Sequence, residues 1–279
     1  MDEDKRSDVA PDAVTMAREG LLDALDALRA HLDALVIVGA QAVYLRTGTT
    51  QVALAEYTTD GDVVIDPELL GSDPLIERAM RASGFTPDPR QSIIGTWISP
   101  HGVSVDLMVP DAVAGPGRRG VRLPPHDSKA MRRARGLEAA LVDNSKMVID
   151  SLNDGDDHRE FTVSVAGPAA LLVAKLHKIH DRIDSPTRLD NKDAHDIYRL
   201  LRAIDTGVFV PPINHLLSEE VSAEITREAL DYLLELFAMG SSAQGSTMAG
   251  AAEELVGDPV AVAESVSLLA QDLLRTLSI

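Results

Sequence analysis

The sequence predicts a two-part protein, with an α/β (α+β) part over residues 1–166 and a helical part over residues 167–279. Two observations support this division. Between residues 35 and 165, short runs of β-forming residues alternate with segments of helical periodicity, which is typical of a domain with a mixed sheet. After Gly167-Pro168, where proline is favoured at a helix start, helical periodicity alone continues to residue 279.

The elements expected in the first part follow from β-formers, apolar spacing and turn residues. They are a helix over 11–34, a strand over 35–38, a helix from 42, a loop over 47–57, a strand over 60–66, a helix over 68–83, strands over 92–99 and 103–109, a hairpin of 139–142 with 147–152, and a strand over 161–165. In the second part we expect helices over 168–183, 190–203, 213–238, 248–256 and 259–277, with a flexible connector over 240–246.

Composition excludes several classes of protein. At 45% hydrophobic and 25% charged residues, the 279-residue chain is typical of a soluble globular protein. The absence of cysteine excludes disulfides, thiolate zinc sites and thiol catalysis. The N-terminus lacks the apolar core of a signal peptide, and no run of 18 apolar residues occurs. We therefore expect a cytoplasmic protein with no membrane contact.

The net charge of −18 argues against indiscriminate nucleic-acid binding, but the charge is unevenly distributed. Residues 203–279 hold two basic and twelve acidic residues. Residues 115–136 instead carry seven basic residues and one acidic residue, a net charge of +6. This basic segment is either a local anion-binding surface or a solvated loop and helix face.

A pair of carboxylates opens the strand over 60–66. Side chains alternate along a strand, so Asp60 and Asp62 share a face, and their repulsion is relieved by a cation such as Mg²⁺. Asp106 is a further carboxylate inside a strand, where aspartate is rare, so it needs a partner. A metal shared by all three would supply one. The alternative is a solvated Asp-Gly-Asp turn.

The helical part places a basic stripe opposite a pair of carboxylates. Lys175, Lys178 and Arg182 recur on one helix, and Asp193 and Asp196 lie three residues apart on the next. One interpretation is that Lys175 serves an anionic substrate. The other is a set of inter-helix salt bridges, which we expect to be exposed and therefore worth little stability.

These features, taken in order, form a pattern. Gly39-Ala40 follows a strand, Thr58 and the two aspartates come next, then Asp106-Leu-Met, Lys175-Leu-His and Lys192-Asp193-x-x-Asp196. Over roughly residues 35–200 this resembles the AbiEii/MenT-type nucleotidyltransferases, which are DNA polymerase β-like enzymes and include toxins of toxin–antitoxin pairs. The resemblance implies a polymerase β-like fold with a mixed sheet, followed by a helical domain.

The resemblance also implies roles for individual residues. Asp60, Asp62 and Asp106 would hold Mg²⁺, and Gly39 and Ala40 would cradle nucleotide phosphates. Thr58 matches the family's hydroxyl residue two positions before the first aspartate. Lys175 would contact the triphosphate, and Asp196 would assist the acceptor or the metal. The family commonly has Ser or Gly at the position of Ala40, so one hydroxyl contact is missing here, and the stretch from Gly39 to Asp60 is longer than usual.

The function that this resemblance implies is transfer of a nucleoside monophosphate from an NTP to a hydroxyl. The acceptor it suggests is RNA, including the 3′ end of tRNA, with the basic segment as docking surface and a cognate antitoxin as a further partner. Two alternatives remain open: a small-molecule acceptor of the aminoglycoside type, and a non-catalytic protein that binds nucleotides or an antitoxin.

Overall fold

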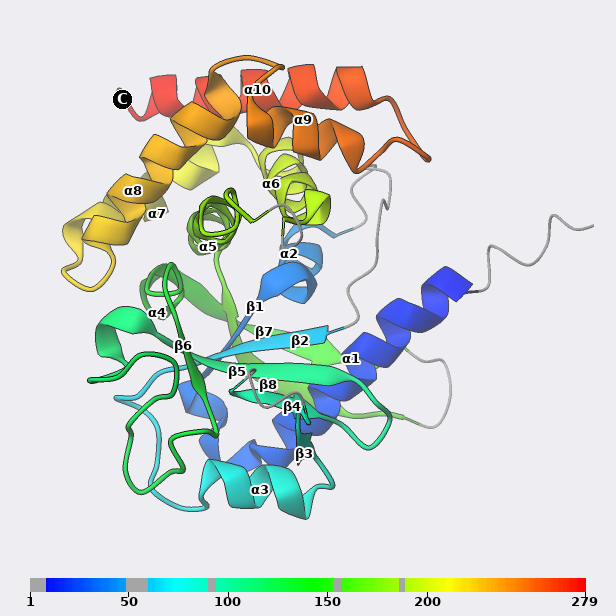
Figure 1. The fold of residues 1–279 in the computed structure, drawn as a ribbon, viewed down its shortest axis with the longest axis vertical. Helices are drawn as coiled ribbons and strands as arrows, with labels where there is room; N and C mark the ends of the chain where they lie inside the picture. The colour runs from blue at the N-terminus through cyan, green and yellow to red at the C-terminus, as the bar shows by residue number, and fades with distance from the viewer. Residues whose placement is uncertain (1–8, 49–59, 90–93, 153–156, 186–188) are drawn as a thin grey trace, which may run out of the picture. The chain divides into compact units, whose positions relative to one another are not determined.

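The computed structural model describes residues 9–48, 60–89, 94–152, 157–185 and 189–279 (Figure 1). The chain divides into two compact units. The first unit comprises 1–41, 57–134 and 144–165, and the second comprises 42–56, 135–143 and 166–279.

The first unit is built on a sheet. Its strands are β1 (Leu35–Val38), β2 (Asp60–Ile65), β3 (Thr86–Pro87), β4 (Thr96–Ile98), β5 (Ser104–Pro110), β6 (Arg132–Ala134), β7 (Asn144–Asp150) and β8 (Glu160–Ala166). Its helices are α1 (Val9–Ala27) and α3 (Ile76–Ala82), with 3₁₀ turns η1 (Arg29–Ala34) and η2 (Asp111–Val113). Helix α2 (Gly39–Thr47) starts in this unit and continues into the second.

The sheet is mixed, as the sequence predicts. The strand order is β3-β4-β5-β2-β1-β8-β7, and β6 pairs with β5 off this path. Strand β2 is antiparallel to β1 and parallel to β5, while β1 is parallel to β8. The carboxylate-bearing strand β2 therefore lies in the interior of the sheet, with a hydrogen-bonded neighbour on each side.

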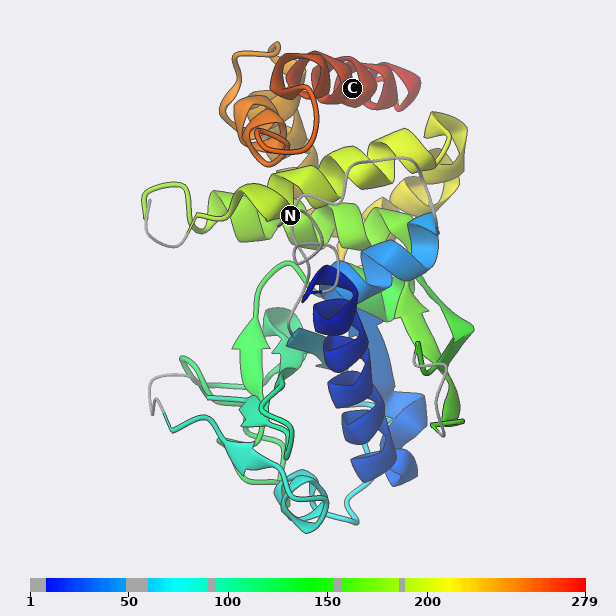
Figure 2. The same ribbon diagram turned by 90° about the vertical axis from the view of Figure 1, so that its right-hand side faces the viewer.

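Helix α1 covers one face of this sheet (Figures 1 and 2). The side chain of Leu21 approaches the backbone of Gly61, and Leu21, Leu22 and Leu25 are fully buried. Burial of one such leucine contributes about 1.5–3 kcal/mol. The apolar face of β2, which carries Val63, is thus packed against α1, and the opposite face carries the carboxylates.

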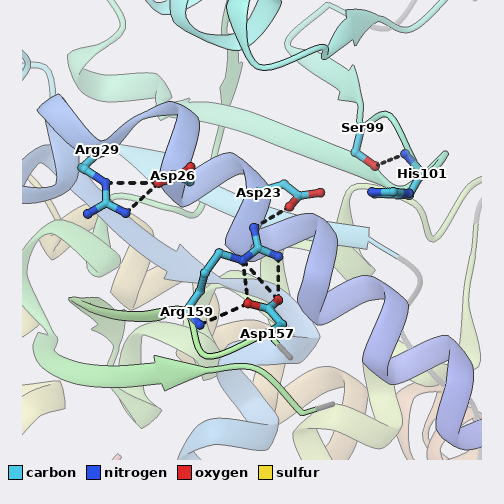
Figure 3. Close-up of polar contacts among 7 residues, drawn as sticks. All are labelled: Asp23, Asp26, Arg29, Ser99, His101, Asp157 and Arg159. Carbon is cyan, nitrogen blue, oxygen red and sulfur yellow. Dashed lines mark hydrogen bonds and ion pairs between the residues drawn. The ribbon is translucent and has the colours of Figure 1, made fainter. Parts of the chain in front are cut away.

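Arg159, the residue before β8, bonds to a residue of α1 (Figure 3). It donates to both oxygens of Asp157 and to Asp23 of α1, the last at 2.5 Å. The bonds from Arg159 hold the pKa of Asp157 below its usual value. In the same view, Arg29 pairs with Asp26 and Ser99 accepts from the backbone N–H of His101.

The second unit is helical. Its elements are α4 (Ala139–Val142), α5 (Pro168–His180), α6 (Asn191–Ala203), α7 (Thr206–Ser218), α8 (Ala223–Leu233), the π-helical turn η3 (Leu234–Ala238), α9 (Gln244–Ala251) and α10 (Pro259–Thr276). Helices α9 and α10 lie side by side (Figures 1 and 2). Asp258 caps α10 by accepting from the backbone N–H groups of Val260 and Ala261. None of the described helices combines the length and the apolar character needed to cross a bilayer.

Several predicted elements are wrong. The helix expected over 68–83 is only α3, because Pro74 disfavours helical backbone at the residue before it. The predicted hairpin strand over 139–142 is helix α4, since Ala-Ala-Leu has high helix propensity. The single helix expected over 213–238 is α7 followed by α8 and η3, with a break over 219–222.

Other parts of the sequence prediction missed structure or lie outside what is described. Strands β3 and β6 were not predicted, because each is only two or three residues long. Helix α9 begins inside the segment expected to be a flexible connector. Most of the expected loop over 47–57 lies outside the described residues.

Candidate active site

Two carboxylates lie on the face of β2 that α1 leaves uncovered. Asp60 and Asp62 alternate with the buried residues Gly61 and Val63, and both are half-buried. Strand alternation thus explains why the apolar residues of β2 enter the core while the two aspartates share the other face.

Strand β5 brings a third carboxylate next to this pair. In the parallel register of β2 with β5, Asp62 lies opposite Asp106 and Asp60 lies opposite Ser104. Residues opposite each other in adjacent strands have side chains on the same face. The sequence prediction that Asp106 lies beside the aspartates of β2 therefore agrees with the register.

Asp106 nevertheless has two partners from its own sheet. Thr96 of β4 donates its hydroxyl to Oδ1 at 2.5 Å, and Arg132 of β6 donates to Oδ2 at 2.7 Å. The expectation that this half-buried carboxylate needs a partner is correct. The partner in the structure is an arginine, because β6 pairs directly with β5.

The turn between β1 and α2 passes directly over Asp62. Gly39 has a φ of +71°, and a Cβ atom at this position would overlap the Asp62 carboxylate. Only glycine permits both the left-handed backbone and this close approach. The first N–H groups of α2 have no partners within the helix, so the start of the helix at Gly39 and Ala40 is suited to bind an anion.

Gln41, in the first turn of α2, fixes the start of β2. Its side-chain amide donates to the carbonyl oxygens of Ala17 at 2.9 Å and Asp60 at 3.3 Å, and its Oε1 accepts from Arg18 at 3.0 Å. Burial lowers the pKa of Arg18, whose charge is offset by Asp150. The sequence analysis missed Gln41, and its only sequence signal is its place directly after the Gly-Ala turn. Thr58, which was predicted to bind nucleotide, lies outside the described residues.

The donor set suits a hard divalent cation in part. Asp60 and Asp62 present carboxylate oxygens from one strand face, which are the ligands that Mg²⁺ prefers. Both oxygens of Asp106 are bonded by Thr96 and Arg132. Among the described residues, no group of three acidic or histidine side chains is arranged to hold a metal. The pair on β2 fits the ion, whereas Asp106 does not join the set in this arrangement.

In the second unit, Lys175 of α5 lies in a buried ion cluster. Its Nζ is 2.8 Å from Oδ1 of Asp193 and 2.6 Å from Oδ2 of Asp196, and only 4% of Lys175 is exposed. Lys178 and Arg182 also approach Asp193, at 2.8 and 3.5 Å. The inter-helix salt bridges of the second interpretation are therefore present. The expectation that they are exposed is wrong for Lys175, because α5 and α6 pack against each other and the residue is buried.

The pKa values follow from this packing. Burial favours the neutral form of Lys175, but the charges of Asp193 and Asp196 outweigh it and raise the pKa of Lys175. Burial likewise disfavours the Asp193 carboxylate, yet Lys175 and Lys178 lower its pKa below the usual value. Both groups are therefore charged at neutral pH.

The rest of α6 anchors the C-terminal end of α2. Arg199 donates to the Thr47 hydroxyl and to the carbonyl oxygen of Gly48, both at 2.7 Å, and its guanidinium lies 5.0 Å from the centroid of the Tyr44 ring. A cation is favourable at the C-terminus of a helix because carbonyl groups there lack intrahelical partners. The sequence analysis did not identify this residue.

Fewer than half of the cations of the basic segment are ion-paired within the protein. Three of its seven cations form ion pairs, namely Arg132–Asp106, Arg133–Asp111 and Arg135–Glu228. The other four are exposed: Arg118, Arg119, Arg122 and Lys129. Arg135 is exposed as well, although it pairs with Glu228. That this segment is a docking surface stays a prediction.

The chain is similar to a crystal structure of a proposed nucleotidyltransferase from H. pylori, with 12% identity over 94% of this chain and 95% of that chain and a TM-score of 0.29. No family model and no curated protein matches the chain. At this TM-score the likeness carries no argument about function, which rests instead on the geometry of the site.

Proposed function

We propose that this protein is a Mg²⁺-dependent nucleotidyltransferase that moves a nucleoside monophosphate from an NTP to a hydroxyl. The observation that carries the proposal is the turn at Gly39, which brings the start of α2 against Asp62. An anion-binding helix start and a pair of metal-binding carboxylates are what a nucleoside triphosphate with its Mg²⁺ requires.

Within the first unit, different residues would bind the ion and the phosphate. Asp60 and Asp62 would hold Mg²⁺, and the backbone N–H groups at Gly39 and Ala40 would hold phosphate oxygens. When bound, the ion supplies positive charge that polarises the α-phosphate and stabilises the leaving pyrophosphate. In the reaction, the acceptor hydroxyl gives up its proton to solvent and its oxygen bonds to the α-phosphorus, while the bond from that phosphorus to the pyrophosphate oxygen breaks and pyrophosphate leaves.

Three further residues enter the proposal through the family resemblance. Lys175 is proposed for the triphosphate, Asp196 for the acceptor or the metal, and Thr58 for the nucleotide. The buried ion pair gives Lys175 and Asp196 a structural role as well. Activity of their variants must therefore be normalised to the folded fraction.

We propose RNA, including the 3′ end of tRNA, as the acceptor, with a toxin role and a cognate antitoxin following from the resemblance. A protein of net charge −18 needs a local cationic surface to bind RNA, because neutralised phosphates supply most non-specific affinity. The exposed residues that meet this need are Arg118, Arg119, Arg122 and Lys129.

Incubation of the protein with each labelled NTP and total tRNA, with Mg²⁺ or with EDTA, tests the reaction. We expect label on RNA only with Mg²⁺, and a loss of at least about a hundredfold in Asp62→Asn, since metal-ligand carboxylates contribute several kcal/mol to such reactions. Asp26→Asn is the matched control, because Asp26 is exposed on α1 and pairs only with Arg29 among the ion pairs of the described residues.

Undiminished transfer in Asp62→Asn would exclude the site. The acceptor is tested separately by reversing Arg118, Arg119 and Arg122 to Glu. RNA labelling should weaken and lose part of its salt dependence, whereas an aminoglycoside, itself a polycation, should be labelled equally well or better. Labelling of an aminoglycoside panel without labelling of RNA would replace the proposed acceptor.

A further inference from the structure

Arg132 is a cation placed on the carboxylate face of the sheet. Strand β6 pairs with β5 so that Arg132 lies opposite Met108, two residues beyond Asp106. Alternation puts Asp106, Met108 and Arg132 on one face. Asp62, opposite Asp106 in the next strand, shares that face.

The backbone of Arg132 is held in place by close packing against the β4–β5 pair. Gly95, just before β4, accepts from the N–H of Leu107 at 2.8 Å and donates to the carbonyl oxygen of Lys129 at 3.3 Å. A Cβ atom at Gly95 would overlap the backbone nitrogen of Arg132. The absence of a side chain at Gly95 is what lets β6 lie close enough to deliver Arg132 to Asp106.

The hydrogen bond from Arg132 gives the second carboxylate oxygen of Asp106 a partner. Arg132 binds Oδ2 at 2.7 Å while Thr96 binds Oδ1, and the Asp106 side chain is 21% exposed. Charge-assisted hydrogen bonds in partly buried positions are stronger than those between exposed groups. The neighbouring residue Arg133 points to the other side, where it pairs with Asp111 and the carbonyl oxygen of Gly117. The contact with Asp106 is therefore specific to Arg132.

We infer that Arg132 is a built-in counter-ion that takes the place of a metal ion at Asp106. A divalent cation binds at Asp60 and Asp62 without Asp106, and a second cation and Arg132 exclude each other at Asp106. This inference rests on the metal site of the proposed function. It differs from a three-carboxylate site in assigning Asp106 to the protein's own guanidinium group.

Titration with Mn²⁺, followed by electron paramagnetic resonance of the free ion, tests the inference without reference to activity. We expect Arg132→Met to bind at least one more Mn²⁺, or to bind it at least about tenfold more tightly, because a positive charge next to a ligand carboxylate is removed. Lys129→Met is the matched control, since Lys129 is an exposed cation in the same segment. It should bind Mn²⁺ as the wild type does.

One more variant separates the explanations. Adding Asp106→Asn to Arg132→Met should abolish the gain. This double variant removes the whole ion pair, so it should bind Mn²⁺ with wild-type affinity, whereas a three-carboxylate site requires a loss of about tenfold or more. The double variant also keeps the inference testable if Arg132→Met, which leaves the Asp106 carboxylate without its cation, fails to fold.

Unchanged binding in a folded Arg132→Met variant, or a loss of about tenfold relative to the wild type in the Arg132→Met, Asp106→Asn double variant, would overturn the inference. Failure of the proposed function looks different. In that case the wild type binds no Mn²⁺, or binds it equally after Asp60→Asn and Asp62→Asn. A gain in Arg132→Met that depends on Asp106 would still support the inference about Arg132.

Discussion

Replacing Lys175 by methionine removes an ammonium group from between two buried carboxylates. In the wild type its Nζ is 2.8 Å from Asp193 and 2.6 Å from Asp196, and neither aspartate exceeds 4% exposure. Removing one partner of a buried ion pair costs about 3–5 kcal/mol, because the other charge remains in a medium of low dielectric constant. Methionine keeps the apolar stem and so isolates the loss of charge.

The cations near Asp193 and Asp196 determine how large this loss of stability is. Asp193 keeps Lys178 at 2.8 Å and Arg182 at 3.5 Å, whereas the ion pair of Asp196 is with Lys175. The cost therefore falls mainly on Asp196, and we expect a loss near the lower end, about 3 kcal/mol in the free energy of unfolding. Lys175→Met combined with Asp196→Asn should recover more than half of this loss, since the uncompensated charge is then gone.

Urea denaturation followed by circular dichroism measures these losses, after a check that each variant unfolds in one transition. Lys178→Met is the matched control, because its side chain is 36% exposed and the expected cost is about 0–1 kcal/mol. Equal losses for Lys175→Met and Lys178→Met would refute the reasoning from burial.

The pH dependence provides a second check. The pKa of Asp193 is lowered in the folded protein, so its contribution is complete above its unfolded pKa, near 4, and is lost as pH falls through the folded value. The pKa of Lys175 is raised, so its contribution is complete below its unfolded pKa, near 10. The difference between wild type and Lys175→Met should therefore be constant from about pH 6 to 9 and decrease below about pH 4.

Two other predictions concern the first turns of α2 and α5. Gly39→Ala should cost more stability than Gly102→Ala and should weaken Mn²⁺ binding, because both glycines have positive φ but only at Gly39 would a Cβ overlap Asp62. Backbone strain alone costs about 1–2 kcal/mol, and equal losses of stability with equal Mn²⁺ affinity would contradict the close approach. Asp143→Asn should be at least as stable as wild type at pH 7 in urea denaturation, because burial raises the Asp143 pKa and so disfavours its charge, while asparagine still accepts from Ala170 at the start of α5. The raised pKa favours the wild type at low pH, so the stability advantage of Asp143→Asn should shrink toward about pH 4. A loss of stability in Asp143→Asn as large as that in Asp143→Ala would show that the negative charge itself is needed.

Much of the fold could be predicted from local sequence. Strands β1, β2, β5 and β8 are runs of β-branched residues bounded by glycine, proline or polar residues, and each was predicted to within one residue or two at either end. Periodicity predicted a sheet-bearing part over 1–166 and a helical part over 167–279, whereas the two compact units interleave along the chain, since residues 42–56 and 135–143 belong to the second. The errors occur where local signals compete, as at 139–142, where helix propensity outweighed a strand-like apolar run.

The order of strands and the partners of charged residues depend on contacts that sequence spacing does not encode. Thr96 and Asp106 are 10 residues apart, and Arg132 is 26 residues beyond Asp106, yet all three meet because β4 and β6 both pair with β5. The sequence analysis inferred that a carboxylate inside a strand needs a partner, and in the structure Thr96 and Arg132 are partners of Asp106. Arg132 was not anticipated, because the strand that carries it is only three residues long.

Burial also determines which cations near α5 can bind an anionic ligand. By residue type alone, Lys175, Lys178 and Arg182 are equally able to bind an anion, but their exposed fractions differ. Lys175 is 5% exposed at its side chain, whereas Lys178 is 36% and Arg182 is 29% exposed. A ligand phosphate can approach the two half-buried cations without breaking the pairs of Lys175, whereas an anion that binds to Lys175 competes with two carboxylates within 3 Å. Binding at Lys175 therefore has to compensate for the loss of its contacts with Asp193 and Asp196.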